Sequence, residues 1–214
     1  MEERHMRMIF SKLGNIRLIS HLDMTRAFLR AFVRAGIELK MSEGFSPHPK
    51  VSFPMPLSVG MESENEILDF TVSEKEERTP NEILNAMKDQ FPSGIEIKKV
   101  HLADRKSKDI AFAEYLIKFE GERDISELSE IFSKPCIIKK KTKKGAEKEI
   151  DILPGIKKID FSHKKGETEI VCVLSASGEN YLNPEFILIA ISEKPEFARI
   201  RRIAAFDEKL NLFE

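Results

Sequence analysis

Apolar positions along the first half of the chain switch between the two-residue period of strands and the 3.6-residue period of helices. Residues 66–72 alternate apolar and polar side chains, which is typical of a half-buried strand. Residues 21–35 contain no Gly or Pro, follow a favourable N-cap serine and predict a helix. The other predicted elements of this half are strands at 7–11, 16–19 and 95–102 and a capped helix that begins at Pro80.

The second half repeats this order of elements. Its strand patterns occupy 115–119, 136–142, 148–152, 157–161, 169–174 and 197–206, and its helices begin after Asp124 and Asn183. Each half approximates β-α-β-β-α-β. The sequence therefore predicts an α+β protein with two ferredoxin-like domains in tandem. We expect the domains to span residues 1–103 and 111–214, separated by a charged and weakly patterned stretch.

Composition narrows the class of protein. The 214 residues are 41% hydrophobic and 33% charged, which is typical of a globular chain and unlike disordered or fibrous ones. No apolar run approaches the ~20 residues of a membrane span, and the first residues are charged, so we expect a cytoplasmic protein without a membrane partner. Cys136 and Cys172 form no Cys-x-x-Cys motif, so we expect no metal and no cofactor in this chain.

Charge is segregated along the chain although the net charge is only −1. Residues 134–165 carry eleven Lys or Arg against four acids, and residues 62–82 carry eight acids against two bases. A neutral total can therefore hide a basic surface that binds a polyanion. We expect RNA or phosphate contacts from these basic side chains of the second half: Lys139, Lys140, Lys141, Lys143, Lys144, Arg199 and Arg201. The competing interpretation is a solvated hairpin whose lysines protect a sheet edge.

The helix at 21–35 carries an arginine ladder. Arg26, Arg30 and Arg34 are four residues apart and share a stripe with Asp23, while the apolar face is expected to include Leu22 and Val33. A ladder with a single acid suits a phosphate chain, and an ordinary exposed helix surface is the alternative. His21 lies at the first turn, where it is a candidate catalytic group or a histidine at the core edge.

A rigid loop at 42–50 is the second candidate motif. Pro47 and Pro49 restrict the backbone on both sides of His48, and Lys50 follows at once. Phe45 is either a stacking platform for a base or a plug in the sheet. We expect this loop to fold over the N-terminus of the preceding helix, so that His21, Asp23, Arg26, His48 and Lys50 form one anion site.

These motifs resemble the radical-SAM-linked protein family, whose members occur alone or joined to a cobalamin-type radical-SAM protein. The resemblance covers roughly the first third of the chain and rests on Ser20-His21-Leu22-Asp23, Arg26, Arg30, Arg34-Ala35-Gly36, the loop Ser42 to Lys50, Pro56-Leu57, Gly60, Glu62-Ser63, Glu66 and Asp69. It implies a radical-SAM enzyme as partner. The predicted architecture is also similar, at the level of fold alone, to RAMP-type RNA-binding proteins, but residues 207–214 lack the glycine-rich loop of that group.

The leading hypothesis is an RNA-binding or substrate-presenting accessory protein of a radical-SAM enzyme, acting in tRNA or rRNA modification. The first alternative is a metal-independent RNA endonuclease of the RAMP type that uses His21 or His48, with Asp23 as a further candidate catalytic residue. The second is a protein-protein adaptor without nucleic acid, which would dock through its acidic segment at 62–82.

Overall fold

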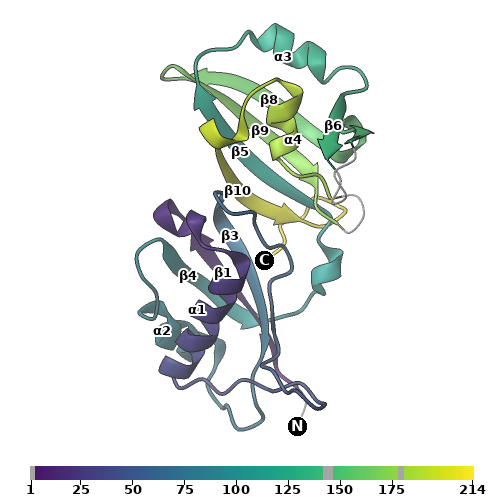
Figure 1. Ribbon diagram of the computed structural model, residues 1–214. Helices are drawn as coiled ribbons and strands as arrows, with labels where there is room; N and C mark the ends of the chain where they lie inside the picture. Colours follow the sequence, from purple (N-terminus) through teal and green to yellow (C-terminus); the bar gives the residue numbers. More distant parts are fainter. Residues whose placement is uncertain (1–2, 142–146, 178–180) are drawn as a thin grey trace. The chain divides into compact units, whose positions relative to one another are not determined.

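A computed structural model describes residues 3–141, 147–177 and 181–214 of the chain. The chain divides into two compact units, each of mixed helix and strand (Figure 1). The N-terminal unit extends to Asp109 and includes Glu214, and the C-terminal unit is Ile110–Phe213. The predicted α+β class is confirmed.

The N-terminal unit is an antiparallel sheet with the strand order β4-β1-β3-β2 and two helices. Its elements are β1 (His5–Lys12), the 3-10 helix η1 (Gly14–Leu18), α1 (His21–Arg34), β2 (Val51–Ser52), β3 (Glu62–Thr71), α2 (Pro80–Lys88), β4 (Ile95–Leu102) and the 3-10 turn η2 (Ser107–Asp109).

Both helices pack on the same face of this sheet because alternate residues of β1 point to it. Met6, Met8 and Phe10 are fully buried in one cluster with side chains of α1 and α2. The rings of Phe10 and Phe28 lie 4.7 Å apart, which fixes α1 on β1. Burial of each such side chain contributes about 2 kcal/mol to folding. The intervening residues of β1 face the other side of the sheet.

Helix ends follow the predicted caps. The Ser20 side chain accepts a hydrogen bond from the backbone of Asp23, and Thr79 and Glu82 form a capping box at α2.

The predicted strand at 16–19 is wrong, because Gly14 adopts a φ of +63° and turns the chain into η1. Val33 was expected on the apolar face, but it is 79% exposed because α1 buries a narrower face than the pattern suggested.

The main strands of the C-terminal unit are also antiparallel and follow the order β10-β5-β9-β8. Strands β6 and β7 form a separate two-stranded sheet. Lys165 and Gly166 both have positive φ, as a tight turn between β8 and β9 requires. The elements are β5 (Phe112–Glu120), α3 (Ile125–Ile131), β6 (Ile137–Lys141), β7 (Glu147–Asp151), η3 (Leu153–Gly155), β8 (Ile156–Lys164), β9 (Glu167–Ser175), α4 (Glu185–Ala190), η5 (Pro195–Phe197) and β10 (Arg199–Phe206).

Candidate functional site

A cavity of about 610 Å³ lies within the N-terminal unit. This volume is in the range of sites that hold small molecules or single nucleotides. The lining residues come from β1, from β2 and the loop before it, from β3 and from the segment after β4. Those with polar or charged side chains are His5, Arg7, His48, Lys50, Ser52, Asp69, Thr71, Asp104, Arg105, Lys106 and Ser107.

The floor of the cavity is the sheet face that points away from the helices. His5 pairs with Thr71 in the β1–β3 register, and Arg7 pairs with Asp69. These residues alternate with Met6 and Met8, which point into the helix-covered core. Two cross-strand polar pairs therefore form the floor of the cavity.

Arg7 and Asp69 form a bidentate ion pair at this floor. Arg7 Nε donates to Asp69 Oδ1 at 2.7 Å, and Nη2 donates to Oδ2 at 2.9 Å. Arg7 Nη2 also donates to the carbonyl of Arg105 at 3.1 Å, so the pair anchors the segment that covers one side of the cavity. The Arg7 side chain is only 1% exposed, and its fork geometry fixes the carboxylate in one orientation.

The loop before β2 is attached to the floor by backbone hydrogen bonds. Ser42 donates its N–H to the carbonyl of His48, and Lys50 donates to the carbonyl of Lys40, both at 2.8 Å. The Thr71 N–H in turn donates to the carbonyl of Lys50 at 3.0 Å. The two arms of the loop are thus joined to each other and to β3, which places His48 and Lys50 in the cavity wall.

Side-chain contacts hold both cavity histidines. His48 Nδ1 lies 2.9 Å from Ser42 Oγ, which leaves Nε2 without a partner among the described residues. His5 Nδ1 lies 3.0 Å from Thr71 Oγ1, and its Nε2 lies 3.6 Å from a Glu3 carboxylate oxygen. Each ring thus has one nitrogen fixed by a hydroxyl group.

The tip of the same loop carries a bare aromatic ring. Gly44 has a φ of +114°, a conformation that favours glycine, and the next residue, Phe45, is fully exposed. The alternative of a Phe45 plug in the sheet is therefore wrong. Phe45 stands in solvent three residues before His48.

Positive charge predominates around the cavity. Four permanently cationic side chains line it against two carboxylates, and two histidines add charge when protonated. Glu3 lies at the side of this group, where its carboxylate contacts Lys40 at 2.6 Å and Lys50 at 3.3 Å. Hydrogen bonds from Lys40 and then Lys50 lower the pKa of Glu3. The arrangement is suited to an anionic ligand.

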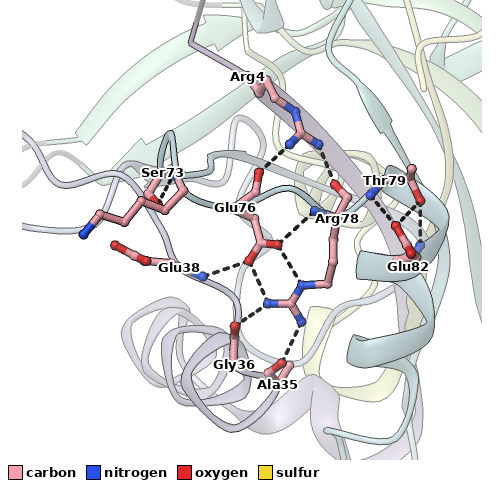
Figure 2. A network of polar contacts seen from close by, with 10 residues as sticks. Arg4, Ala35, Gly36, Glu38, Ser73, Glu76, Arg78, Thr79 and Glu82 are labelled. Atoms are coloured by element: carbon pink, nitrogen blue, oxygen red, sulfur yellow. Dashed lines mark hydrogen bonds and ion pairs between the residues drawn. The ribbon is translucent and has the colours of Figure 1, made fainter. Parts of the chain in front are cut away.

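A polar network fixes the chain where it leaves α1 toward this loop (Figure 2). Arg78 donates to the carbonyls of Ala35 and Gly36 and pairs with the buried Glu76, which also accepts the N–H of Glu38 at 3.2 Å. A cation at a helix C-terminus stabilises the free carbonyls there. The side-chain hydrogen bond from Arg78 is the main cause that lowers the pKa of Glu76.

The remaining predicted residues of the first half lie elsewhere. The His21 ring meets Phe53 edge-on at 5.3 Å, and Asp23 contacts Ser20 and, at 3.3 Å, Arg26. The hydrogen bond from Ser20, followed by that from Arg26, lowers the pKa of Asp23. These residues do not line the cavity. The prediction of one shared site is wrong because α1 packs on the opposite face of the sheet.

The arginine ladder is divided among different neighbours. Arg34 Nη2 donates to the carbonyl of Gln90 at 2.5 Å, and Arg26 contacts Asp23. Arg30 is exposed and has no ionic or hydrogen-bonding partner among the described residues. Arg30 is therefore the one arginine of the ladder whose guanidinium makes no described polar contact.

Acidic groups accompany the predicted cations of the C-terminal unit. Lys139 lies directly opposite Glu149 in the β6–β7 register, and Arg199 contacts Glu167. Lys140 lies over the ring of Phe186 at 5.2 Å. Arg199 and Arg201 share one face of β10 as predicted from strand alternation. Strand β6 ends at Lys141, and Lys143 and Lys144 lie outside the described residues.

Sequence reasoning missed the cavity floor. The available signal was the alternation of His5 and Arg7 with buried methionines in one strand, and of Asp69 and Thr71 with apolar residues in another. Such polar positions on two strands share a face only if the strands are neighbours in the right register. The pairing of β1 with β3 and its register belong to the tertiary structure and could not be predicted from the pattern of either strand.

Within residues 3–141, 147–177 and 181–214, no group of three His, Cys, Asp or Glu side chains is placed to hold a metal ion. The helices of the same ranges are all too short or too polar to cross a membrane. The fold and the cavity define an α+β protein with a basic cavity on one sheet face.

Comparison with known proteins identifies the family. Residues 5–184 match the family described as "Uncharacterized protein conserved in bacteria (DUF2344)", and the chain belongs to it. No curated protein matches the chain. One solved structure, described as an unknown protein from Galdieria sulphuraria, is 12% identical over 94% of this chain and 98% of its own, with a TM-score of 0.28.

Proposed function

We propose that the protein is a cytoplasmic RNA-binding accessory protein of a radical-SAM enzyme in tRNA or rRNA modification, and that its RNA site is the cavity of the N-terminal unit. The carrying observation is the basic cavity whose wall loop ends in the bare ring of Phe45. Cationic groups bind the phosphate backbone, and exposed aromatic rings stack on bases. The two features belong together in proteins that bind RNA.

The arrangement of the sheet supports the same proposal. We infer that both units are ferredoxin-like. Among the described residues, each has two α-helices and a main sheet of four antiparallel strands, β1 to β4 in one unit and β5, β8, β9 and β10 in the other. In each sheet the first and third of these four strands in chain order lie at the centre. The cavity lies on the face away from α1 and α2. RNA-recognition modules with a four-stranded sheet bind single-stranded bases on a sheet face with exposed aromatic residues.

The partner class rests on the resemblance of residues 20–69 to radical-SAM-linked proteins. Two motifs of that resemblance supply parts of the cavity, namely the loop that carries His48 and Lys50 and the strand that carries Asp69. An accessory role agrees with a site that binds an anion and leaves the radical chemistry to the partner. In this proposal, the lysine-rich strands β6 and β7 of the C-terminal unit also bind RNA.

Ultraviolet crosslinking in the protein's own cells tests this function. The tagged chain is purified after irradiation, its bound RNA is sequenced, its crosslinked peptides are mapped, and coprecipitated proteins are identified. We expect tRNA or rRNA fragments, crosslinks within 42–50 or 103–107, and a protein with the cysteine triad of radical-SAM enzymes. Recovery of proteins without RNA would contradict the RNA role and favour the adaptor hypothesis.

A second candidate function is metal-independent RNA cleavage. The observation that favours it is the presence of His5 and His48 in one cavity with Lys50. In such a reaction a 2′-hydroxyl attacks the adjacent phosphorus, one imidazole accepts its proton, and the other gives a proton to the departing 5′-oxygen. The P–O5′ bond breaks and a 2′,3′-cyclic phosphate forms. Cleavage of end-labelled RNA in EDTA by the wild type, lost in both His5→Ala and His48→Ala, would establish it, whereas intact RNA would exclude it.

A further inference from the structure

We infer that the cavity and Phe45 form one composite site for single-stranded RNA, in which an unpaired base stacks on the Phe45 ring while a neighbouring phosphate enters the cavity. This inference rests on the proposed RNA-binding function and specifies its substrate class. It selects single strands against duplexes and assigns the loop at 42–50 as the element that recognises the difference.

The position of Phe45 on the loop supports a role in ligand binding more strongly than its exposure does. Single exposed apolar side chains are common on protein surfaces and need no explanation. Phe45 differs because it is fully exposed at the tip of a loop whose arms are fixed by the Met41–Pro49 bridge. An aromatic ring on a fixed loop loses little conformational entropy when it binds. Phe45 is therefore preorganised for a flat ligand.

The spacing within the loop fits one short segment of a nucleic-acid strand. His48 lies three positions after Phe45 in the sequence, and three positions of fully extended chain span at most about 11 Å. His48 and Lys50 line the cavity itself. A ligand that stacks on Phe45 can therefore place its next phosphate groups near Lys50 and His48. The ring supplies base contact without sequence readout, and the cavity supplies charge.

Double-stranded RNA does not fit this arrangement. The flat faces of its bases are covered by their neighbours in the helical stack, so a protruding ring finds a free base only in a loop, a bulge or a single strand. A duplex would reach the cavity with its phosphates alone. We therefore expect Phe45 to contribute to the affinity for single strands and to contribute nothing to the affinity for a duplex.

The absence of tryptophan from the sequence provides a direct probe. Phe45→Trp introduces a single indole at the loop tip, and Val33→Trp places one on the 79% exposed position of α1, beside the arginine ladder and away from the cavity face. Both variants are titrated with a 12-nucleotide oligo(U), with a 12-base-pair RNA duplex and with heparin. Binding itself is followed by fluorescence anisotropy of labelled RNA with the wild type.

We expect oligo(U) to quench the indole emission of Phe45→Trp and to leave that of Val33→Trp unchanged, while the duplex and heparin quench neither variant. Phe45→Ala should weaken oligo(U) binding about tenfold, the loss of one stacked base, and Phe45→Tyr should restore it. Duplex affinity should be equal in the wild type and in these two variants. Quenching in Val33→Trp alone would overturn the inference and place RNA on the arginine ladder.

Two further outcomes separate this inference from the proposed function. If oligo(U) binds by anisotropy but Phe45→Ala binds it as tightly as the wild type, the composite site is wrong and RNA binding stands. If neither oligo(U) nor the duplex binds at low salt, both the composite site and the proposed RNA-binding function are wrong. A purified protein partner whose binding is lost in Phe45→Ala while RNA binding is unchanged would show that the ring is a protein anchor instead.

Discussion

The Ser42 side chain holds His48 by two contacts within one loop. Its hydroxyl oxygen accepts the backbone N–H of His48 at 3.1 Å and lies 2.9 Å from Nδ1 of the same residue. One small side chain thus fixes both the backbone and the ring of the cavity histidine, and leaves the other ring nitrogen open to a ligand. The proposed RNA site requires that this loop be ordered before the ligand binds.

Ser42→Ala should therefore weaken RNA binding without unfolding the protein. The loss of one such hydrogen bond costs about 1 kcal/mol, which corresponds to roughly a fivefold lower affinity. Ser46→Ala is the matched control, because the described contact of Ser46 with His48 uses its carbonyl and not its hydroxyl. Fluorescence anisotropy measures both variants. Equal affinities of Ser42→Ala and the wild type would show that the loop needs no such support.

Asp69→Asn should destabilise the N-terminal unit strongly. The substitution removes the bidentate carboxylate from the Arg7 guanidinium, which is only 1% exposed, and breaking such a buried pair costs about 3 kcal/mol or more. Asp104→Asn, an exposed carboxylate of the same cavity, should change stability by less than about 0.5 kcal/mol. Urea unfolding followed by circular dichroism compares them. Similar small losses in both variants would mean that Asp69 does not stabilise the floor.

Glu76→Gln should lower stability in a pH-dependent manner. Arg78 depresses the pKa of Glu76 in the folded protein, so the stabilisation is fully present above the unfolded pKa of about 4.3 and is lost as the pH falls through the folded pKa. At pH 7 the variant should be about 2 kcal/mol less stable than the wild type, and the difference should shrink toward pH 3.

Urea midpoints at pH 7 and pH 3 measure this difference. Glu77→Gln is the control, since its exposed side chain adjoins Glu76 but has no described hydrogen bond or ion pair. The same difference between wild type and Glu76→Gln at both pH values would contradict the role of the Glu76–Arg78 pair.

Both thiols should be unreactive in the native protein. Cys172 is fully buried, and burial raises its pKa to about 12, while burial and then Asp151 raise the pKa of Cys136. Because the thiolate is the reactive form, a disulfide reagent at pH 8 should modify neither until denaturant is added. Absorbance of the released chromophore counts the thiols, and immediate reaction of one of them would show that the sheet of the C-terminal unit is not closed around it.

Local patterns in the sequence predicted most elements, and they failed where the backbone conformation of one residue or the packing of a helix decided the outcome. Ser20 and Thr79 mark helix starts because capping is a contact within four residues. The strand expected at 16–19 failed because Gly14 can adopt positive φ, which the apolar pattern does not record. Val33 was wrongly expected to be buried because the apolar face of α1 is wider than the part of the helix that packs against the sheet.

Some residues of the candidate site could be predicted from local sequence, and others could not. The sequence identified three residues of one loop, namely Phe45, His48 and Lys50. Two prolines and a glycine in this loop restrict its backbone, and this restriction can be predicted from the sequence. His5 and Thr71 were not, since their juxtaposition depends on the β1–β3 register. The link from His21 to His48 was wrong for a related reason, because the sequence does not state which face of the sheet α1 covers.

The salt dependence of single-stranded RNA binding tests the central claim most directly. Each phosphate contact contributes about −0.7 to the slope of log affinity against log salt concentration. Lys106 and Lys50 line the cavity, whereas Lys139 belongs to the β6–β7 hairpin, where Glu149 lies opposite. We predict a steep negative slope for the wild type, a slope shallower by roughly 0.7 in Lys50→Met and in Lys106→Met, and a smaller change in Lys139→Met. A salt-independent affinity, or slopes that stay at the wild-type value in both cavity variants, would contradict RNA binding in the cavity.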